Sequence, residues 1–393
     1  DMIMFKCRHV CKWLLFAMRV IGVLCICCAT SIDLKSCYYG YSRCLGVPDN
    51  MMTNVTVLQD NGCVVDGAGN TNAANFSQIS RLAGPMVQGL GFTLAGSKAV
   101  PFMDGMPCVF GFEEDITALN LQLTDIHITL RNGDVVHPEI ATLTPAVEQN
   151  EKKTLLLLGN FGYRDGQEPV NVAIRDASYD GPYLAYDGTG PQMVLARLVP
   201  KADHVKNERT GTMADAIRPD YGNCDSHYPK STHVVQLVFS GGVHTKDGIG
   251  APDNSHLGHF TVAIGGSSLS SEVLGLSDLH DHDNYLTICL DLSDGATLAS
   301  LQQGMTVRVT SERDQADFFT GPKGDCMSPL VHSPCGDSRT KTQTISVNVS
   351  AVTSLFTTTT TTTAGVETNA STGRSTLSTG VAVLFIIAAL ANQ

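Results

Sequence analysis

The feature that most limits the fold is a two-residue alternation of apolar and polar side chains in short runs. In Ile126–Leu130 (IHITL), three apolar residues alternate with His127 and Thr129, as in a strand that buries one face. The pair Asn132-Gly133 follows at once. Such a pair adopts the left-handed backbone of a tight hairpin turn. The pattern therefore predicts a β-hairpin that continues into Val135 and Val136.

Comparable runs recur along the chain, separated by turn sequences such as Asp187-Gly188 and Asp294-Gly295. Glycine and aspartate favour the backbone conformations that turns require. The runs cover residues 153–159, 169–174, 191–199, 232–239, 259–264, 284–292, 305–311 and, as a last edge strand, 344–349. Helical spacing is confined to Phe76–Leu90 and Ala296–Gln303. The sequence predicts an all-β fold of β-sandwiches with few short helices. A barrel or one large jelly roll is the alternative.

The strand-rich region is too long for one sandwich core, since single cores of this kind commonly hold about 100 residues. We expect a Cys-containing head at 30–91, then two Ig-like sandwiches at 92–200 and 232–340. The strand-poor segment 201–231 would link them. Residues 321–337 contain Cys326 and Cys335 and are predicted to close the second sandwich as a stapled loop.

Residues 1–29 have the pattern of a secretory signal peptide. Basic residues up to Arg19 precede the apolar run Val20–Cys28, and small residues follow around Ala29 and Ser31. This order of basic, apolar and small residues is typical of such signals. The run is shorter than the ~20 residues of a membrane span. A buried helix is the alternative, which the cysteines and Arg19 make less suitable.

The C-terminal region has the pattern of a stalk and an anchor. Thr357–Thr363 is a run of threonines, which suits an O-glycosylated stalk over residues 341–371. A small-residue triplet at Asn369 or Ser371 precedes a polar spacer and the apolar run Val381–Ala391. This arrangement predicts a GPI-attachment signal at 372–393, with Asn369 or Ser371 as the lipid-anchor residue. A single-pass span or a secreted form is the alternative.

Cysteines and glycosylation motifs also favour an extracytoplasmic protein. Beyond the predicted signal, the cysteines are Cys37, Cys44, Cys63, Cys108, Cys224, Cys289, Cys326 and Cys335. An even set without CxxC spacing favours disulfides over a zinc site, with open connectivity; Cys326 with Cys335 is the simplest local pair. Asn-x-Ser/Thr motifs occur at Asn54, Asn75, Asn348 and Asn369. They predict N-glycans on a surface route.

Charge excludes one class of partner. The formal charge of the chain is −12, and four basic residues and one acidic residue precede residue 30, which leaves −15 on the remainder. A surface of this sign repels phosphate backbones and anionic lipid heads. Nucleic acid is therefore not expected as a partner.

Two stretches resemble known families. Ser36–Asn50 (SCYYGYSRCLGVPDN), with Cys63 beyond it, resembles the opening of DOMON domains, in which a cysteine pair brackets a short turn. The resemblance covers residues 37–63 and ends in the following segment. For that reason the haem or sugar binding of that family is not carried over. Residues 110–162 resemble an Ig-like module of secreted multi-domain proteins, a family that implies a fold and no activity.

One polar cluster has the residue types of a metal site. His280, Asp281, His282 and Asp283 precede a predicted strand. Carboxylates suit Ca²⁺, whereas two histidines with a carboxylate suit a transition metal. No cofactor is predicted from this cluster; of the ions that it could hold, we favour Ca²⁺ over zinc. A solvated loop between strands is the alternative. Two further groups are weaker candidates: His244, His256 and His259, and the acidic Glu113, Glu114 and Asp115.

No motif of the sequence specifies a reaction. A G-x-S-x-G elbow, HExxH, a phosphate-binding loop and a dinucleotide fingerprint are all missing from the sequence. We therefore expect a surface-anchored glycoprotein that serves adhesion, recognition or matrix binding, with cell-surface glycans or matrix proteins as partners. The alternatives are a calcium-dependent binding module, a cell-surface hydrolase, or a haem or redox protein.

Overall fold

The structure, a computed structural model, divides into two units, Asp1–Ser354 and Leu355–Gln393. It describes residues 31–39, 41–61, 63, 65, 68–69, 71, 73–75, 101–143, 151–162, 167–181, 184, 191–202, 224–243, 254–277, 283–310 and 342–349. All of these residues belong to the first unit. They form four sheets, which pack as two pairs.

The first sheet pair is built from β1 to β10. One sheet has the order β3-β2-β4-β8-β7, with β1 also pairing with β4, and the other has the order β10-β9-β5-β6. The strands are β1 (Leu34–Cys37), β2 (Tyr41–Val47), β3 (Ala74–Asn75), β4 (Met103–Phe110), β5 (Ile126–Leu130), β6 (Val135–Val136), β7 (Ile140–Thr142), β8 (Thr154–Gly159), β9 (Pro169–Ile174) and β10 (Ala177–Tyr179). All pairings are antiparallel except that of β2 with β3. Their facing side chains form one buried core.

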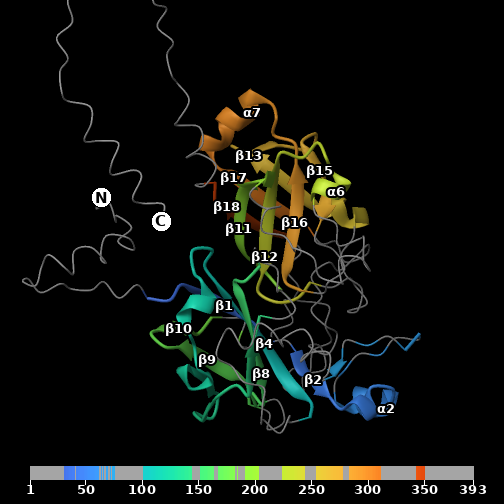
Figure 1. The fold of residues 1–393 in the computed structure, drawn as a ribbon, viewed down its shortest axis with the longest axis vertical. Helices are drawn as coiled ribbons and strands as arrows, with labels where there is room; N and C mark the ends of the chain where they lie inside the picture. Colours follow the sequence, from blue (N-terminus) through green and yellow to red (C-terminus); the bar gives the residue numbers. More distant parts are fainter. Residues whose placement is uncertain are drawn as a thin grey trace, which may run out of the picture. The chain divides into compact units, whose positions relative to one another are not determined.

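The second sheet pair is built from β11 to β18. Its sheets have the orders β11-β12-β16-β15 and β14-β13-β17-β18. The strands are β11 (Met193–Pro200), β12 (His233–Phe239), β13 (Phe260–Ile264), β14 (Ser267–Ser268), β15 (Val273–Ser277), β16 (Tyr285–Leu290), β17 (Met305–Thr310) and β18 (Thr342–Val347). Figure 1 shows β11, β12 and β16 side by side, with β13 and β17 in a second layer. A second buried core lies between these layers.

Short helices connect the strands and carry little of the core. The α-helices are α2 (Val55–Asp60), α6 (Cys224–His227) and α7 (Gly295–Ser300). The 3₁₀ helices are η2 (Asp49–Met51), η3 (Ile116–Leu119), η4 (Leu123–Asp125), η8 (Asn254–His259) and η9 (Leu301–Gln303). The helical spacing in Ala296–Gln303 is realised as α7 and η9, whereas Phe76–Leu90 lies outside the described residues.

Strand β12 is buried on both of its faces. Val235, Leu237 and Phe239 enter the second core. Because side chains alternate between faces, Val234 and Val238 lie on the opposite face, where they join other buried clusters. Gln236 lies between them and is also fully buried. Both faces of this sheet are therefore covered.

The all-β prediction is confirmed, and the predicted runs lie in β8, β9, β11, β12, β13, β16, β17 and β18. The predicted hairpin is β5–β6, but its turn differs from the expected one. Gly133 has a positive φ of 89°, whereas Asn132, which is also described, does not have a positive φ. The Asn132 side chain instead accepts from Asp134 N at 2.9 Å. The turn therefore has one left-handed residue, Gly133, and the side-chain hydrogen bond of Asn132 stabilises it in place of a second left-handed residue at Asn132.

Segments beyond the predicted sandwich boundaries also join the sheets. β1 and β2, from the expected head, pair with β4. β18, at the start of the expected stalk, pairs with β17 along its whole length. Beyond β18, Asn348 forms a parallel bridge with Arg197 of β11. This bridge connects the two sheets of the second pair along one edge.

Candidate binding site

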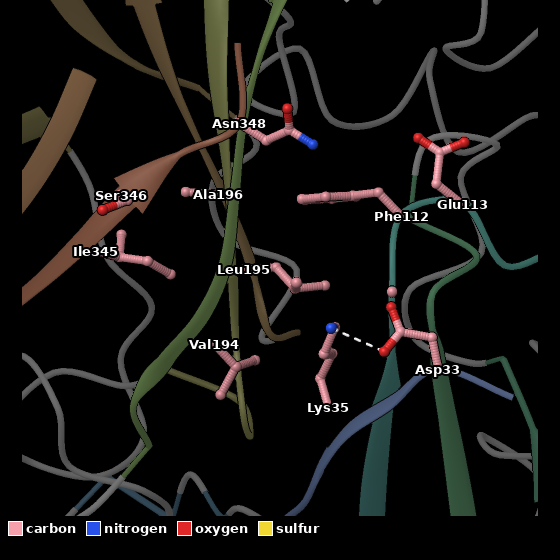
Figure 2. A pocket seen from close by; sticks show the side chains of 11 residues that line it. Asp33, Lys35, Phe112, Glu113, Val194, Leu195, Ala196, Ile345, Ser346 and Asn348 are labelled. Carbon is pink, nitrogen blue, oxygen red and sulfur yellow. Dashed lines mark ion pairs between the residues drawn. The ribbon is translucent and has the colours of Figure 1, made fainter. Parts of the chain in front are cut away.

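A cavity of about 330 Å³ lies between residues of the two sheet pairs (Figure 2). The first pair contributes Asp33, Lys35, Gly111, Phe112 and Glu113, and the second contributes Val194, Leu195, Ala196, Ile345, Ser346 and Asn348. The volume is at the lower end of the ~300–1,000 Å³ of small-molecule sites. We therefore treat this cavity as the candidate site.

Gly111 brings the segments before β1 and after β4 into close contact. Its backbone N donates to Asp33 O at 2.8 Å. A Cβ at Gly111 would lie 2.0 Å from Asp33 Oδ2. At that distance a carbon and an oxygen atom would overlap sterically. Asp33 in turn forms an ion pair with Lys35 at 2.8 Å, while both side chains stay 40% or more exposed. The glycine thus fixes one charged wall of the cavity.

Phe112 forms part of the apolar surface and is held by a cation. The Arg197 guanidinium lies 4.6 Å from the centre of the Phe112 ring, within the range of a cation–π interaction. Arg197 Nε also donates to Gln236 Oε1 at 3.0 Å. Burial lowers the pKa of Arg197, while Tyr285 and Glu113 act in the opposite direction. Arginine keeps its charge despite such a shift.

The opposite wall comes from β11, from β18 and from Asn348, which follows β18. Leu198 N donates to Asn348 O, and Asn348 N donates to Ala196 O, both at 2.9 Å. These two bonds fix the backbone of Asn348 at the rim. Its side chain is exposed, and Figure 2 shows its amide extending on the side of the Phe112 ring. Asn348 is one of the predicted glycosylation residues.

The cavity combines an apolar floor with a polar rim. Phe112, Val194, Leu195 and Ile345 are half-buried, whereas the polar rim residues are exposed. The charges of the lining acids, Asp33 and Glu113, are offset by Lys35 and by Arg197, which lies over the Phe112 ring. Among these eleven described lining residues, none is His or Cys. The arrangement suits a neutral molecule that has both an apolar face and hydroxyl groups.

The predicted metal cluster is only partly described. His280, Asp281 and His282 lie outside the described residues. Asp283 is buried, and its Oδ1 accepts from Tyr285 N at 2.6 Å. In the part of the chain that the structure describes, no group of three or more His, Cys, Asp or Glu side chains is placed to hold a metal ion. The Ca²⁺ site stays a prediction.

The two weaker metal candidates are partly described, and one carboxylate among them has another role. His256 and His259 lie on η8 with ring centres 6.1 Å apart, and His244 is outside the described residues. Asp115 caps η3 by accepting from Thr117 N and Ala118 N. The Thr117 hydroxyl also donates to Asp115 Oδ1, at 2.6 Å, and this side-chain hydrogen bond is the main cause of the lowered pKa of Asp115. Helix capping therefore explains this carboxylate.

Of the predicted glycosylation residues, three are described. Asn54 is exposed and caps α2, its Oδ1 accepting from Val57 N at 3.2 Å. Its Nδ2, the atom that would carry a glycan, takes no part in this hydrogen bond. Asn75 is half-buried on β3. Asn348 lines the cavity. Asn369 and the predicted anchor at Asn369 or Ser371 lie outside the described residues.

The structure joins four of the eight predicted cysteines. Cys37–Cys108 connects β1 to β4, and Cys224–Cys289 connects α6 to β16. Cys44 and Cys63 are buried in one apolar cluster with Val47, Leu58 and Ala73. Cys326 and Cys335 lie outside the described residues.

Sequence reasoning did not find the contact between the sheet pairs. Tyr285 of β16 is buried, and its hydroxyl donates to Glu151 O. Asn284 Nδ2 donates to Thr154 Oγ1 of β8 at 3.0 Å. We call these four residues the junction. Next to it, Val109, Val238 and Tyr285 form an apolar cluster that Phe112, Val194 and Leu195 extend. No motif marks these residues, because they come from segments far apart in the chain.

Comparison with models of known protein families and with curated proteins finds no match to this chain. Within the described residues, no helix has the length and apolar character of a membrane span.

Proposed function

We propose that this chain is an extracellular, surface-anchored glycoprotein that acts as an adhesion, recognition or matrix-binding module. The observation that carries the recognition role is the cavity lined by Phe112, Lys35 and Asn348. It presents an aromatic ring beside exposed donors and acceptors, which is the chemistry that a neutral saccharide requires: the ring packs on C–H groups and the rim bonds hydroxyls.

The disulfides and the exposed acceptor asparagines support the extracytoplasmic route. Disulfides such as Cys37–Cys108 and Cys224–Cys289 persist in oxidising compartments. Asn54 and Asn348 are both exposed, as glycan acceptors must be. The lipid anchor at the outer face of the plasma membrane remains part of the proposal. Release of the protein from intact cells by a GPI-specific phospholipase tests it, and retention after treatment contradicts it.

Binding is tested with residues 30–371 carrying Ser350→Ala, which removes the glycan-acceptor motif at Asn348; the chain is secreted from eukaryotic cells and applied to arrays of cell-surface glycans and matrix proteins. We expect binding to a neutral saccharide, and we expect Lys35→Ala to weaken it by losing a rim donor. Lys230→Ala is the matched control, because Lys230 is exposed and lies outside the cavity lining. Failure to bind any glycan or matrix protein overturns the recognition role.

The other expectations stay predictions. A calcium-dependent module at His280–Asp283 predicts that chelation lowers the melting temperature, because an ion selective for the native state stabilises it. A hydrolase or a haem or redox protein predicts labelling by activity-based probes or a haem absorption spectrum. The resemblances of residues 37–63 to DOMON openings and of 110–162 to Ig-like modules likewise remain predictions.

A further inference from the structure

Asn348 combines two features that occur together nowhere else on the cavity wall. It lines the cavity, and it begins the sequence Asn348-Val349-Ser350, which is a glycan-acceptor motif. Of the other motif asparagines, Asn54 and Asn75 are not among the lining residues. We propose that the first sugar of a glycan on Asn348 lies in the cavity against Phe112 and closes it to external saccharides. The inference rests on the proposed function, since it requires passage through a glycosylating compartment.

The backbone at Asn348 fixes where such a glycan begins. Its N–H donates to Ala196 O, and its carbonyl accepts from Leu198 N; both partners lie on β11. The parallel bridge to Arg197 holds the same point. A sugar on Nδ2 therefore starts from a rigid position, and Figure 2 shows that this amide and the Phe112 ring belong to the same cavity. Little conformational freedom is lost when the sugar settles there, which favours the bound arrangement.

The cavity has the size and the groups for one sugar ring. Its volume is about 330 Å³, whereas a water molecule in the liquid occupies ~30 Å³, so the space is roughly that of a small saccharide unit and not of a whole glycan. Phe112, Val194 and Leu195 offer an apolar face. Lys35 can donate to sugar oxygens, and Glu113 can accept from sugar hydroxyls. The exposed rim leaves a way out for the rest of the glycan.

Asn54 provides an internal comparison. It is exposed at the N-cap of α2, away from the cavity lining. A glycan there has no cavity to enter. The two sites of one molecule should therefore differ in how readily an amidase can reach the first sugar.

The experiment uses the glycosylated chain as secreted from eukaryotic cells and an N-glycan amidase, with release at each asparagine followed by mass spectrometry. In the folded protein, we expect release at Asn348 to be at least about tenfold slower than at Asn54, because the amidase must wait for local opening. After denaturation, both glycans should leave at similar rates. Equal rates in the folded protein overturn the inference.

Variants separate protection by the cavity from general inaccessibility. Phe112→Ala removes the ring and should make the Asn348 glycan releasable. Glu113→Gln, at an exposed position, should accelerate release with less risk to folding. Lys230→Ala should leave the difference between the two sites unchanged. If both cavity variants fold and keep full protection, the cavity is not the cause and the inference is wrong.

The outcomes also distinguish the inference from the proposed function. A glycan on Asn54 with none on Asn348 overturns the inference alone. The absence of glycans from every motif overturns the extracytoplasmic route and the inference together. On the glycan array, Asn348→Gln and Ser350→Ala both remove the motif and should bind saccharide more strongly than the glycosylated chain. Unchanged binding by both variants contradicts closure of the cavity by the glycan.

Discussion

The hydroxyl of Tyr285 uses all of its hydrogen-bonding capacity at the junction. It donates to Glu151 O and accepts from Lys153 N at 3.1 Å and from Thr154 Oγ1 at 3.2 Å. A phenol has one proton to donate and two lone pairs to accept with. Burial, the largest cause, raises the pKa of Tyr285 well above its ordinary value. The hydroxyl therefore stays protonated and keeps donating across the physiological pH range.

Tyr285→Phe is expected to destabilise the protein by about 1–3 kcal/mol, since it leaves buried partners without a hydrogen bond. Urea unfolding measures the change. Tyr228→Phe is the control, because Tyr228 is only half-buried and its hydroxyl bonds to Asn254. It should cost less. Equal losses for the two variants would contradict the special role of the junction hydroxyl.

For Thr287 we expect the opposite effect, a gain in stability on removal of the hydroxyl. It lies fully buried on β16, and its Oγ1 has no hydrogen-bond partner in the structure as described. Thr287→Val replaces a desolvated hydroxyl with a methyl group, and we expect a gain of about 1 kcal/mol in the free energy of unfolding. The matched variant is Thr154→Val, which loses two hydrogen bonds and should be destabilised. A loss at Thr287 as large as that at Thr154 would refute the prediction.

His233 gives the protein an acid-sensitive element. Burial lowers its pKa from the ordinary 6.5, so the unfolded chain binds a proton more tightly than the folded chain does. As the pH falls below about 6.5, the unfolded state is protonated first and the native state loses stability. The loss continues until the pH passes the lower folded-state pKa.

His233→Gln should therefore flatten the fall of the urea midpoint between about pH 7 and about pH 5, where histidine titrates. The control is His227→Gln at an exposed position, which should leave the slope nearly unchanged. An identical slope in the His233 variant and the wild type would show that this histidine does not contribute.

At the scale of elements, the two disulfides among the described residues close loops of similar length. The sequence separations are 71 for Cys37–Cys108 and 65 for Cys224–Cys289. In the chain-entropy model the stabilisation depends on the logarithm of loop length, so both should contribute about 4 kcal/mol. Replacing each pair by alanines should give similar losses in urea unfolding. Wild-type stability in either double variant would contradict the prediction.

The strands show what alternation can and cannot predict. Runs with one buried face or a continuous apolar stretch, such as β8 and β12, lie where the sequence predicts them. The central strand β4 was missed, although all eight of its residues are buried. Its sequence contains Gly105 and Pro107, which usually argue against a strand interior. Both of its faces are covered, so no polar alternation remains to reveal it.

At the scale of the whole molecule, the candidate site was beyond reach of sequence reasoning. The sequence identifies Asn348 as a glycan acceptor, but nothing local connects it with Phe112 or Lys35. Their proximity depends on the junction and on the bridge between Asn348 and Arg197. A helix cap such as Asp115 bonds to residues two and three positions further along the chain, so a short sequence pattern can indicate it. Contacts between segments far apart in the chain leave no such local pattern.

The junction predicts that the two sheet pairs unfold together. Asn284 Nδ2 donates both to Thr154 Oγ1 and to Phe239 O, so one side chain connects β8 with β12. Val109 packs with Val238 and Tyr285 beside it. Separating the pairs would expose this apolar cluster and leave the buried polar groups without partners, which costs free energy in both parts. Residues 30–371 should therefore unfold in a single calorimetric transition.

Asn284→Ala should lower the melting temperature and split that transition into two, because coupling is lost while each core remains intact. Asn171→Ala is the control: its amide donates to Ser178 Oγ at 2.6 Å within the first sheet pair, and its loss should leave one transition. Two transitions in the wild type would mean that the contacts of Asn284 and Tyr285 are too weak to couple the cores. Since the cavity wall depends on those contacts, the protection expected for the Asn348 glycan should then also be weak.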